Sequence, residues 1–408
     1  MTPPSALLYR LILPFAGGYF ISYLFRTANA VVGPVLSSEL SLGAADLGLL
    51  TSAYFIAFGS TQLPLGILLD RFGARRVEAL LLLVAAAGAA VFALSGGMGA
   101  LAVGRGLIGL GVSACLMAAL KSFSQWFPLE RQASLTGWIM TSGTLGALVA
   151  SAPLDAALHF ATWREVFFGL AALTGGIAVW VWVSVPEKPP AGRPQSFAQL
   201  AAGLGEIVRR RHFWRFATIA FAQVGGYMAV QSLWSGAWLM HVNGYERSAA
   251  AGYLMAMNAA MAVAYFLIGL LATELGRRGI RPDHLLGGGM TLALISLLLI
   301  ITQASSHHYL LWAAYGFFSS TGTLNYTATS AGFPVELLGR VNTLLNLLSF
   351  VGAFLLQWGM GILIDALGAS GHSAATAHVG AFLLLFSVQA ASLCWFYFCG
   401  WQAARKTS

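Results

Sequence analysis

Long apolar segments separated by short polar breaks make up almost the whole chain. Twelve apolar runs, each as long as a bilayer crossing of about 20 helical residues or longer, can be marked along the 408 residues. None alternates as a strand does, and backbone groups in lipid must bond within their own segment, so all are expected to be helices. The approximate spans are 9–34, 46–69, 77–95, 99–124, 132–155, 164–185, 213–240, 249–274, 284–303, 309–333, 341–366 and 378–402.

Composition places these helices in a membrane. The chain is 58% hydrophobic and 9% charged, whereas soluble domains carry about 25% charged residues. The net charge of +8 raises the question of nucleic acid, but the basic residues lie in the breaks and form no patch interleaved with aromatic residues. We therefore expect a lipid bilayer as the surroundings and no nucleic-acid partner.

The basic residues also predict the orientation. If the N-terminus lies inside, cytoplasmic segments and helix ends hold 18 of the 22 Lys and Arg residues, and the outside keeps Arg164 and Arg247. Cytoplasmic loops are enriched in Lys and Arg, so both termini are expected in the cytoplasm. The interpretation is a multi-pass protein of the bacterial inner membrane.

The break at residues 66–76 carries a motif. It reads Gly-Ile-Leu-Leu-Asp-Arg-Phe-Gly-Ala-Arg-Arg and resembles the loop signature G-x-L-x-D-R-x-G-R-R of the major facilitator superfamily, with Ala74 in place of a basic residue. In that family the loop joins membrane helices two and three on the cytoplasmic side. The resemblance implies that Asp70 meets the N-terminus of helix eleven, where the helix dipole favours a carboxylate. It assigns a gating role to Gly66, Asp70, Arg71, Gly73 and Arg75.

A second, degraded copy of the motif at residues 269–278, close to half a chain later, indicates an internal repeat. It adds Glu274 and Arg278 to the expected gating residues. Leu154-Asp155-Ala156 is likewise echoed by Ile364-Asp365-Ala366. The predicted fold is therefore all-α: twelve transmembrane helices in two pseudo-symmetric six-helix bundles, residues 1–186 and 213–408. The linker 187–212 is expected to hold an amphipathic helix on the cytoplasmic face.

Two charges, Arg26 and Arg105, fall well inside the predicted hydrocarbon. Such placement costs at least about 2.5–3.5 kcal/mol, so a functional reason is the default. A structural arginine bonded to carbonyls of neighbouring helices remains the alternative for both. Arg105 lies in a segment, Leu101–Gly111, that resembles a second signature of the same superfamily, whose arginine is linked to substrate or proton handling. All 14 acidic residues fall in loops or at helix ends, so a buried guanidinium without a buried counter-charge is expected.

Polar stripes on several runs suggest a shared cavity. Tyr23, Arg26 and Asn29 share one face of the first helix, and further stripes lie on the seventh, tenth and eleventh. Hydrogen bonding between helices is the alternative for any single stripe. The candidate substrate-binding residues are Tyr23, Arg26, Asn29, Arg105, Gln223, Tyr227, Gln231, Trp234, Tyr326, Asn342 and Asn346.

These features favour a secondary transporter that moves a small anionic solute by alternating access. A coupling ion, either a proton or an exchanged anion, is a further expected partner, and we expect a monomer. A multidrug or metabolite exporter and a non-transporting membrane receptor of the same fold remain alternatives. An enzyme is not expected because no nucleophile–base pair or metal cluster lies within the helices, and we expect no cofactor and no metal.

The basic asymmetry makes the topology testable. Reporter fusions after Ser408 and within residues 187–212 should report the cytoplasm, and fusions within 367–377 should report the outside. A periplasmic C-terminus would contradict the twelve-helix topology.

Overall fold

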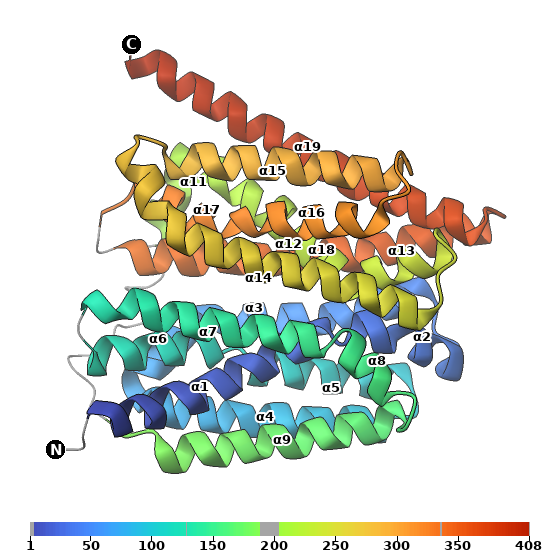
Figure 1. Ribbon diagram of the computed structural model, residues 1–408, viewed down its shortest axis with the longest axis horizontal. Helices are drawn as coiled ribbons and strands as arrows, with labels where there is room; N and C mark the ends of the chain where they lie inside the picture. Colours follow the sequence, from blue (N-terminus) through green and yellow to red (C-terminus); the bar gives the residue numbers. More distant parts are fainter. Residues whose placement is uncertain (1–3, 128, 188–203, 335–336, 408) are drawn as a thin grey trace. The chain divides into compact units, whose positions relative to one another are not determined.

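The computed structural model describes residues 4–127, 129–187, 204–334 and 337–407, and every regular element in those ranges is helical (Figure 1). The first helices are α1 (Pro4–Thr27), α2 (Asn29–Leu40), α3 (Ala44–Phe72), α4 (Ala74–Leu94), α5 (Met98–Gly111), α6 (Cys115–Trp126), α7 (Leu129–Val149), α8 (Ala152–Ala157) and α9 (Trp163–Ser184). Then follow α11 (Arg211–Thr218), η1 (Ile219–Val224), α12 (Gly225–Ala229), η2 (Val230–Trp234), α13 (Ser235–His241), α14 (Arg247–Arg277), α15 (Pro282–Ile301), α16 (His308–Ser319), η3 (Ser320–Thr323), α17 (Leu324–Ser330), α18 (Leu338–Ala369) and α19 (Ala374–Thr407).

Within the described residues, 8 helical segments are long and apolar enough to cross a membrane. Their lipid-compatible character comes from Leu, Ala, Val and Gly, as the apolar runs predict. The segments are Ala44–Phe72, Ala74–Leu94, Met98–Trp126, Trp163–Ser184, Arg247–Ile268, Pro282–Ile301, Leu338–Ala369 and Ala374–Gln402.

The chain divides into two compact units. The first contains Met1–Leu42 and Leu49–Gln195, and the second contains Gly43–Gly48 and Ser196–Ser408. Helix α3 therefore begins in the second unit and continues in the first.

Small residues set the helix packing of the first unit. In Figure 1 α4 runs beside α9, and it also packs on α5, while α1 packs on α7. At the contact of α1 and α7, a Cβ added to Gly146 would lie closer than 3.0 Å to the backbone oxygen of Phe20. Such approaches are typical of membrane helices, because close backbone contact replaces the hydrophobic driving force that lipid removes.

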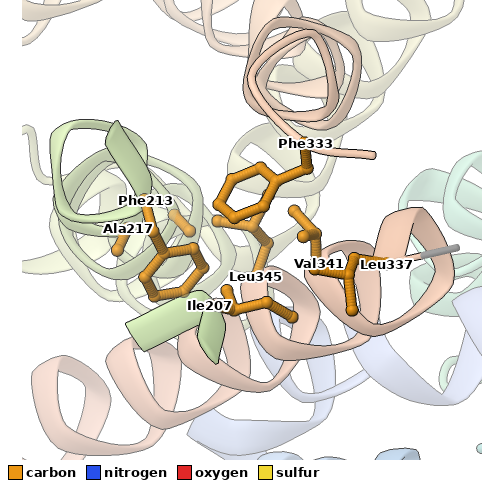
Figure 2. Close-up of a cluster of buried hydrophobic side chains, with 8 residues drawn as sticks. Ile207, Phe213, Ala217, Phe333, Leu337, Val341 and Leu345 are labelled. Atoms are coloured by element: carbon orange, nitrogen blue, oxygen red, sulfur yellow. The ribbon is translucent and has the colours of Figure 1, made fainter. Parts of the chain in front are cut away.

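An apolar cluster holds the start of the second unit's helices together. Ile207 and Phe213 are fully buried and meet Phe333, Val341 and Leu345, which come from the segment before α18 and from α18 itself (Figure 2). Residues 188–203 of the predicted linker lie outside the described residues. Residues 204–209 are helical, and Ile207 is the residue that fastens this helix to the second unit.

Several helices contain irregular segments. The first predicted run is divided by a turn at Ala28 into α1 and α2, and Val112–Ala114 separate α5 from α6. The seventh run contains two π-helical segments, η1 and η2, with a short α-helix between them. π segments are often found at functional sites, because their i→i+5 bonds rotate the side chains that follow.

The close approach at Gly146 gives a stability prediction. Gly146→Ala should lower the melting temperature of the purified protein, because overpacking costs typically about 1–3 kcal/mol and the atom that it meets is backbone. Gly137 lies on the same helix with nothing within 4 Å of its added Cβ, so Gly137→Ala is the matched control. Equal melting temperatures for the two variants would contradict this packing.

Candidate functional site

Arg26 lies in the last turn of α1, two residues before the turn at Ala28 that divides α1 from α2. Its side chain is 6% exposed, and its guanidinium carbon lies 4.0 Å from the centroid of the Tyr23 ring. Tyr19 and Tyr54 are its other electrostatic neighbours, and its Nε has no hydrogen-bond partner. Within the described ranges no carboxylate forms an ion pair with Arg26. A buried cation is therefore held by aromatic rings rather than by a protein anion.

Arg105 is fully buried on α5 and is tied to the same neighbourhood. One of its terminal nitrogens donates to the backbone oxygen of Phe25 at 3.0 Å, while Nε and the second terminal nitrogen have no hydrogen-bond partner. Its guanidinium carbon lies 5.4 Å from the centroid of the Tyr54 ring. The carbonyl bond fits the structural alternative, but most of the donor capacity of Arg105 is unused.

Tyr54 of α3 is a site residue that the sequence reading missed. It is fully buried, donates to the backbone oxygen of Ser22 at 3.2 Å, and interacts electrostatically with both Arg26 and Arg105. The signal was present, because Thr51, Tyr54 and Gln62 follow helical spacing on one run.

Asn29 completes the group in the first unit. Its side-chain nitrogen donates to the Thr51 hydroxyl at 2.9 Å, and its Oδ1 has no hydrogen-bond partner. Of the four residues that the sequence predicts for this unit, Tyr23 contacts Arg26, and Tyr54 interacts with both Arg26 and Arg105. Asn29 contacts Thr51, one turn from Tyr54 on α3.

In the second unit the predicted stripe on the seventh run divides among three neighbouring helices. Gln223 donates to the backbone oxygen of Gln389 on α19 at 2.8 Å, and Gln231 donates to Asn258 on α14 at 2.8 Å. Trp234 donates to the backbone oxygen of Gln357 on α18 at 3.0 Å. The π segments η1 and η2 explain the division, since each changes the direction of the residues after it.

The remaining predicted residues form two pairs. Tyr326 of α17 donates to Asn346 of α18 at 3.0 Å, and Ser330 donates to Asn342 at 3.2 Å. Tyr227 shares Met261 with Gln231, at 3.6 Å from its hydroxyl and 3.4 Å from the amide nitrogen. These contacts support hydrogen bonding between helices for these residues. A solute that binds here would have to replace those hydrogen bonds.

The gating loop has partners within the first unit. Asp70 forms an ion pair with Lys121 of α6, and Arg75 contacts Glu187 at 2.6 Å. Gly73, with φ of 81°, adopts the left-handed backbone that favours glycine between α3 and α4. Lys121, the partner of Asp70, is a second residue that sequence reasoning missed.

Other expected gating contacts stay predictions. A side chain at Gly66 would have nothing within 4 Å, and the Arg71 guanidinium carbon lies 5.3 Å from the centroid of the Phe72 ring. The side chain of Glu274 lies outside the described part of the chain, and Arg278 is exposed. The meeting of Asp70 with helix eleven likewise remains an expectation from the family.

Asp365 of α18 caps the N-terminus of α3. Its two carboxylate oxygens accept the backbone N–H groups of Ala44 at 2.9 Å and Ala45 at 2.7 Å, all within the second unit. The contact is close-packed, because a Cβ added to Gly361 would lie 3.0 Å or less from the backbone of Ala44 and Ala45. The first N–H groups of a helix have no partner inside it, so a carboxylate there is stabilising.

The expectation that the chain lacks a buried carboxylate is wrong. Glu78, four residues into α4, is 0% exposed. Asp155 and Asp283 are also buried, with Asp283 paired to Arg215 at 3.4 Å. Position near a helix end did not predict exposure, because neighbouring helices cover these ends. No group of His, Cys, Asp and Glu in the described ranges is arranged to hold a metal ion.

These features are those of a membrane carrier: a bundle of apolar helices with a few buried polar groups. The sequence profile of the Major Facilitator Superfamily matches residues 15–357. The chain belongs to this superfamily, whose members are transporters and not enzymes. Several helices in the described ranges are long and apolar enough to cross a membrane.

Similar proteins agree with this membership. The hexuronate transporter of Escherichia coli (strain K12) is 26% identical over 223 residues, which cover 50% of this chain and 51% of the relative. The galacturonate transporter of Dickeya chrysanthemi is 27% identical over 224 residues, 50% of this chain and 64% of the relative. The chain thus spans about half to two thirds of the length of these relatives.

A solved structure matches the fold over nearly the full length. The crystal structure of a bacterial homologue of the human lysosomal transporter Spinster, in an inward-facing and unoccupied conformation, has a TM-score of 0.75 and 20% identity. The match covers 97% of this chain and 96% of that chain. At this identity the likeness concerns the fold.

The cap on α3 makes a specific prediction. Asp365→Asn should speed hydrogen exchange in the first turn of α3 roughly two- to thirtyfold, since charge–dipole contacts are worth about 0.3–2 kcal/mol. Exchange measured by mass spectrometry on the full-length protein tests it. Asp46→Asn is the matched control, because Asp46 accepts only from Gly43 at the same helix end, at 3.2 Å. An unchanged exchange rate in Asp365→Asn would show that this contact does not stabilise the first turn of α3.

Proposed function

We propose that the protein is a secondary transporter of a small sugar acid, which it moves across the bacterial inner membrane by alternating access. The observation that carries the proposal is the buried guanidinium of Arg26, which has no carboxylate partner among the described residues. Two relatives, a hexuronate transporter and a galacturonate transporter, support the same class of solute.

The electrostatic argument starts from the cost of burying a cation. An ionised group taken out of water without a partner is strongly unfavourable, and an arginine does not lose its proton under such conditions. Aromatic rings such as that of Tyr23 recover part of the cost, about 2 kcal/mol or more when the pair is desolvated. A solute carboxylate, held by two parallel N–H···O bonds, would recover much more. An anionic solute therefore fits Arg26 better than a neutral or cationic one.

A sugar acid also needs partners for its hydroxyl groups. Neutral amide and hydroxyl side chains are suited to that task, and the second unit offers Gln231, Asn342, Asn346 and Tyr326. In the first unit the free Oδ1 of Asn29 could accept a hydroxyl. We propose that Arg26, with Arg105, holds the carboxylate and that Asn29 helps to orient the ring.

We further propose twelve crossings in two pseudo-symmetric bundles, with both termini in the cytoplasm. Eight crossings are the long apolar segments, and four are helices divided by irregular backbone: α1 with α2, α7 with α8, α11 through α13, and α16 with α17. Divided helices at membrane depth are tolerated where they line a cavity. The Asp70 loop would then gate the cytoplasmic side.

The proposal predicts how Arg26 variants bind galacturonate. Arg26→Ala should weaken binding at least tenfold, because losing a hydrogen bond to a charged group costs about 1.5–3 kcal/mol. Arg26→Lys should bind with intermediate affinity, since a compact ammonium cannot make the planar two-point contact. Galactose, which has the ring without the carboxylate, should not bind to the wild-type protein. Calorimetry on the purified protein measures all three.

A matched control separates binding from folding. Arg215 is half-buried and has a protein partner, Asp283, and it donates to the backbone oxygen of Phe396 at 3.1 Å. Arg215→Lys should lower the melting temperature and leave galacturonate affinity unchanged, whereas Arg26→Ala should leave the ligand-free melting temperature similar or higher. Wild-type galacturonate flux in Arg26→Ala liposomes, or ligands that prove to be cations, would contradict the proposal.

A further inference from the structure

Glu78 is a buried carboxyl group that the binding site does not use. It lies on α4, is 0% exposed, and both of its carboxyl oxygens are buried without a hydrogen-bond partner in the described ranges. Its position is four residues, or about 6 Å along the helix axis, from Ala74, where α4 begins after the turn at Gly73. A small local opening would therefore bring water to it.

The surrounding helices make room for the carboxyl group. A Cβ added to Gly18 of α1 would lie closer than 3.0 Å to Oε1 of Glu78 and 3.6 Å from the sulfur of Cys115 on α6. Helix α1 thus has no side chain where the carboxyl group lies. The thiol of Cys115 is the one polar side chain in the described ranges that interacts with Glu78. Neither neighbour carries a charge.

Every cation on the helices packed against Glu78 is engaged elsewhere. Helix α4 packs against α5, α6 and α9, and α1 provides Gly18. On α4 itself Arg75 and Arg76 contact Glu187, at 2.6 and 3.0 Å. The cationic groups of the other helices are held as follows: Lys121 by Asp70, Arg164 by Glu39, Arg105 by the Phe25 carbonyl, and Arg26 by the Tyr23 ring, while Arg10 is exposed.

The remaining titratable groups of these helices are not bases that could take its proton. Tyr19, Tyr23 and Tyr9 on α1 and the Cys115 thiol are neutral acids, and Glu165 on α9 accepts from Thr162 at the helix start. An ionised carboxylate that has a weak thiol donor and no cation beside it in an apolar bundle is far more costly than the neutral acid. The arrangement of the structure is therefore that of a protonated Glu78.

We propose that Glu78 is the proton-binding site of this transporter, neutral in the conformation described and deprotonated when the cycle exposes it to water. The proton leaves to water on the side of the turn at Gly73, and Glu78 is protonated again from water on the opposite side of the membrane in the other half of the cycle. The inference rests on the proposed function, because it supplies the coupling ion for the anionic solute. One monovalent anion moved with one proton transfers no net charge, so a pH gradient can drive accumulation.

The first test needs no solute. Infrared difference spectra of the full-length protein at neutral pH should show the carbonyl stretch of a buried protonated carboxyl group. Glu78→Gln should lack this band, and Glu206→Gln, which changes an exposed glutamate paired with Arg210, should keep it. Cys115→Ala should shift the band, because the thiol is the polar neighbour of Glu78. Spectra that are equal in the wild type and Glu78→Gln would overturn the proposal, and the Cys115→Ala shift decides it if Glu78→Gln does not fold.

The second test uses liposomes and galacturonate. With an inward proton gradient of one pH unit, the wild type should accumulate galacturonate up to about tenfold, the limit for one proton per anion. Glu78→Gln should reach no accumulation yet still exchange labelled for unlabelled galacturonate. Wild-type accumulation in Glu78→Gln would overturn the proposal. If the wild type moves no galacturonate at all, the proposed function fails, and the infrared band alone then decides whether Glu78 binds a proton.

Discussion

A charge inside a lipid-embedded bundle must find a partner, and this structure depends on how three buried groups meet that requirement. Arg105 has a backbone carbonyl, Arg26 has aromatic rings, and Glu78 is best accounted for as a neutral acid. None is neutralised by an opposite charge among the described residues. Each group can therefore form further stabilising interactions, with a solute or with a proton.

The irregular helices follow the same constraint from the backbone side. The π segments η1 and η2 flank Gly225–Ala229, and the turn at Ala28 directly follows the turn of helix that carries Arg26. Freed backbone groups in a membrane require a polar neighbourhood. Irregular backbone and polar side chains accordingly occur together here, which makes the divided helices the natural place for solute contacts.

The sequence predicts the helical character well, because an apolar run in lipid has no other way to satisfy its backbone. It also predicts that Arg26 and Arg105 are buried, since the hydrophobic runs around them lie inside the membrane. The sequence does not predict contacts that depend on which helix lies beside a residue. The stripe containing Gln223, Gln231 and Trp234 assumed a uniform helix, and the π segments direct these residues to different helices. The burial of Glu78 depends on a bare position on α1 that is distant in sequence, and no local pattern reports it.

That bare position has an evolutionary consequence. A Cβ at position 18 would lie closer than 3.0 Å to Oε1 of Glu78, which is the end of a flexible side chain. A larger residue at position 18 would therefore require the carboxyl group to take another rotamer. Substitutions at the two positions are expected to be coupled, because a shorter residue at position 78 removes the need for that shift.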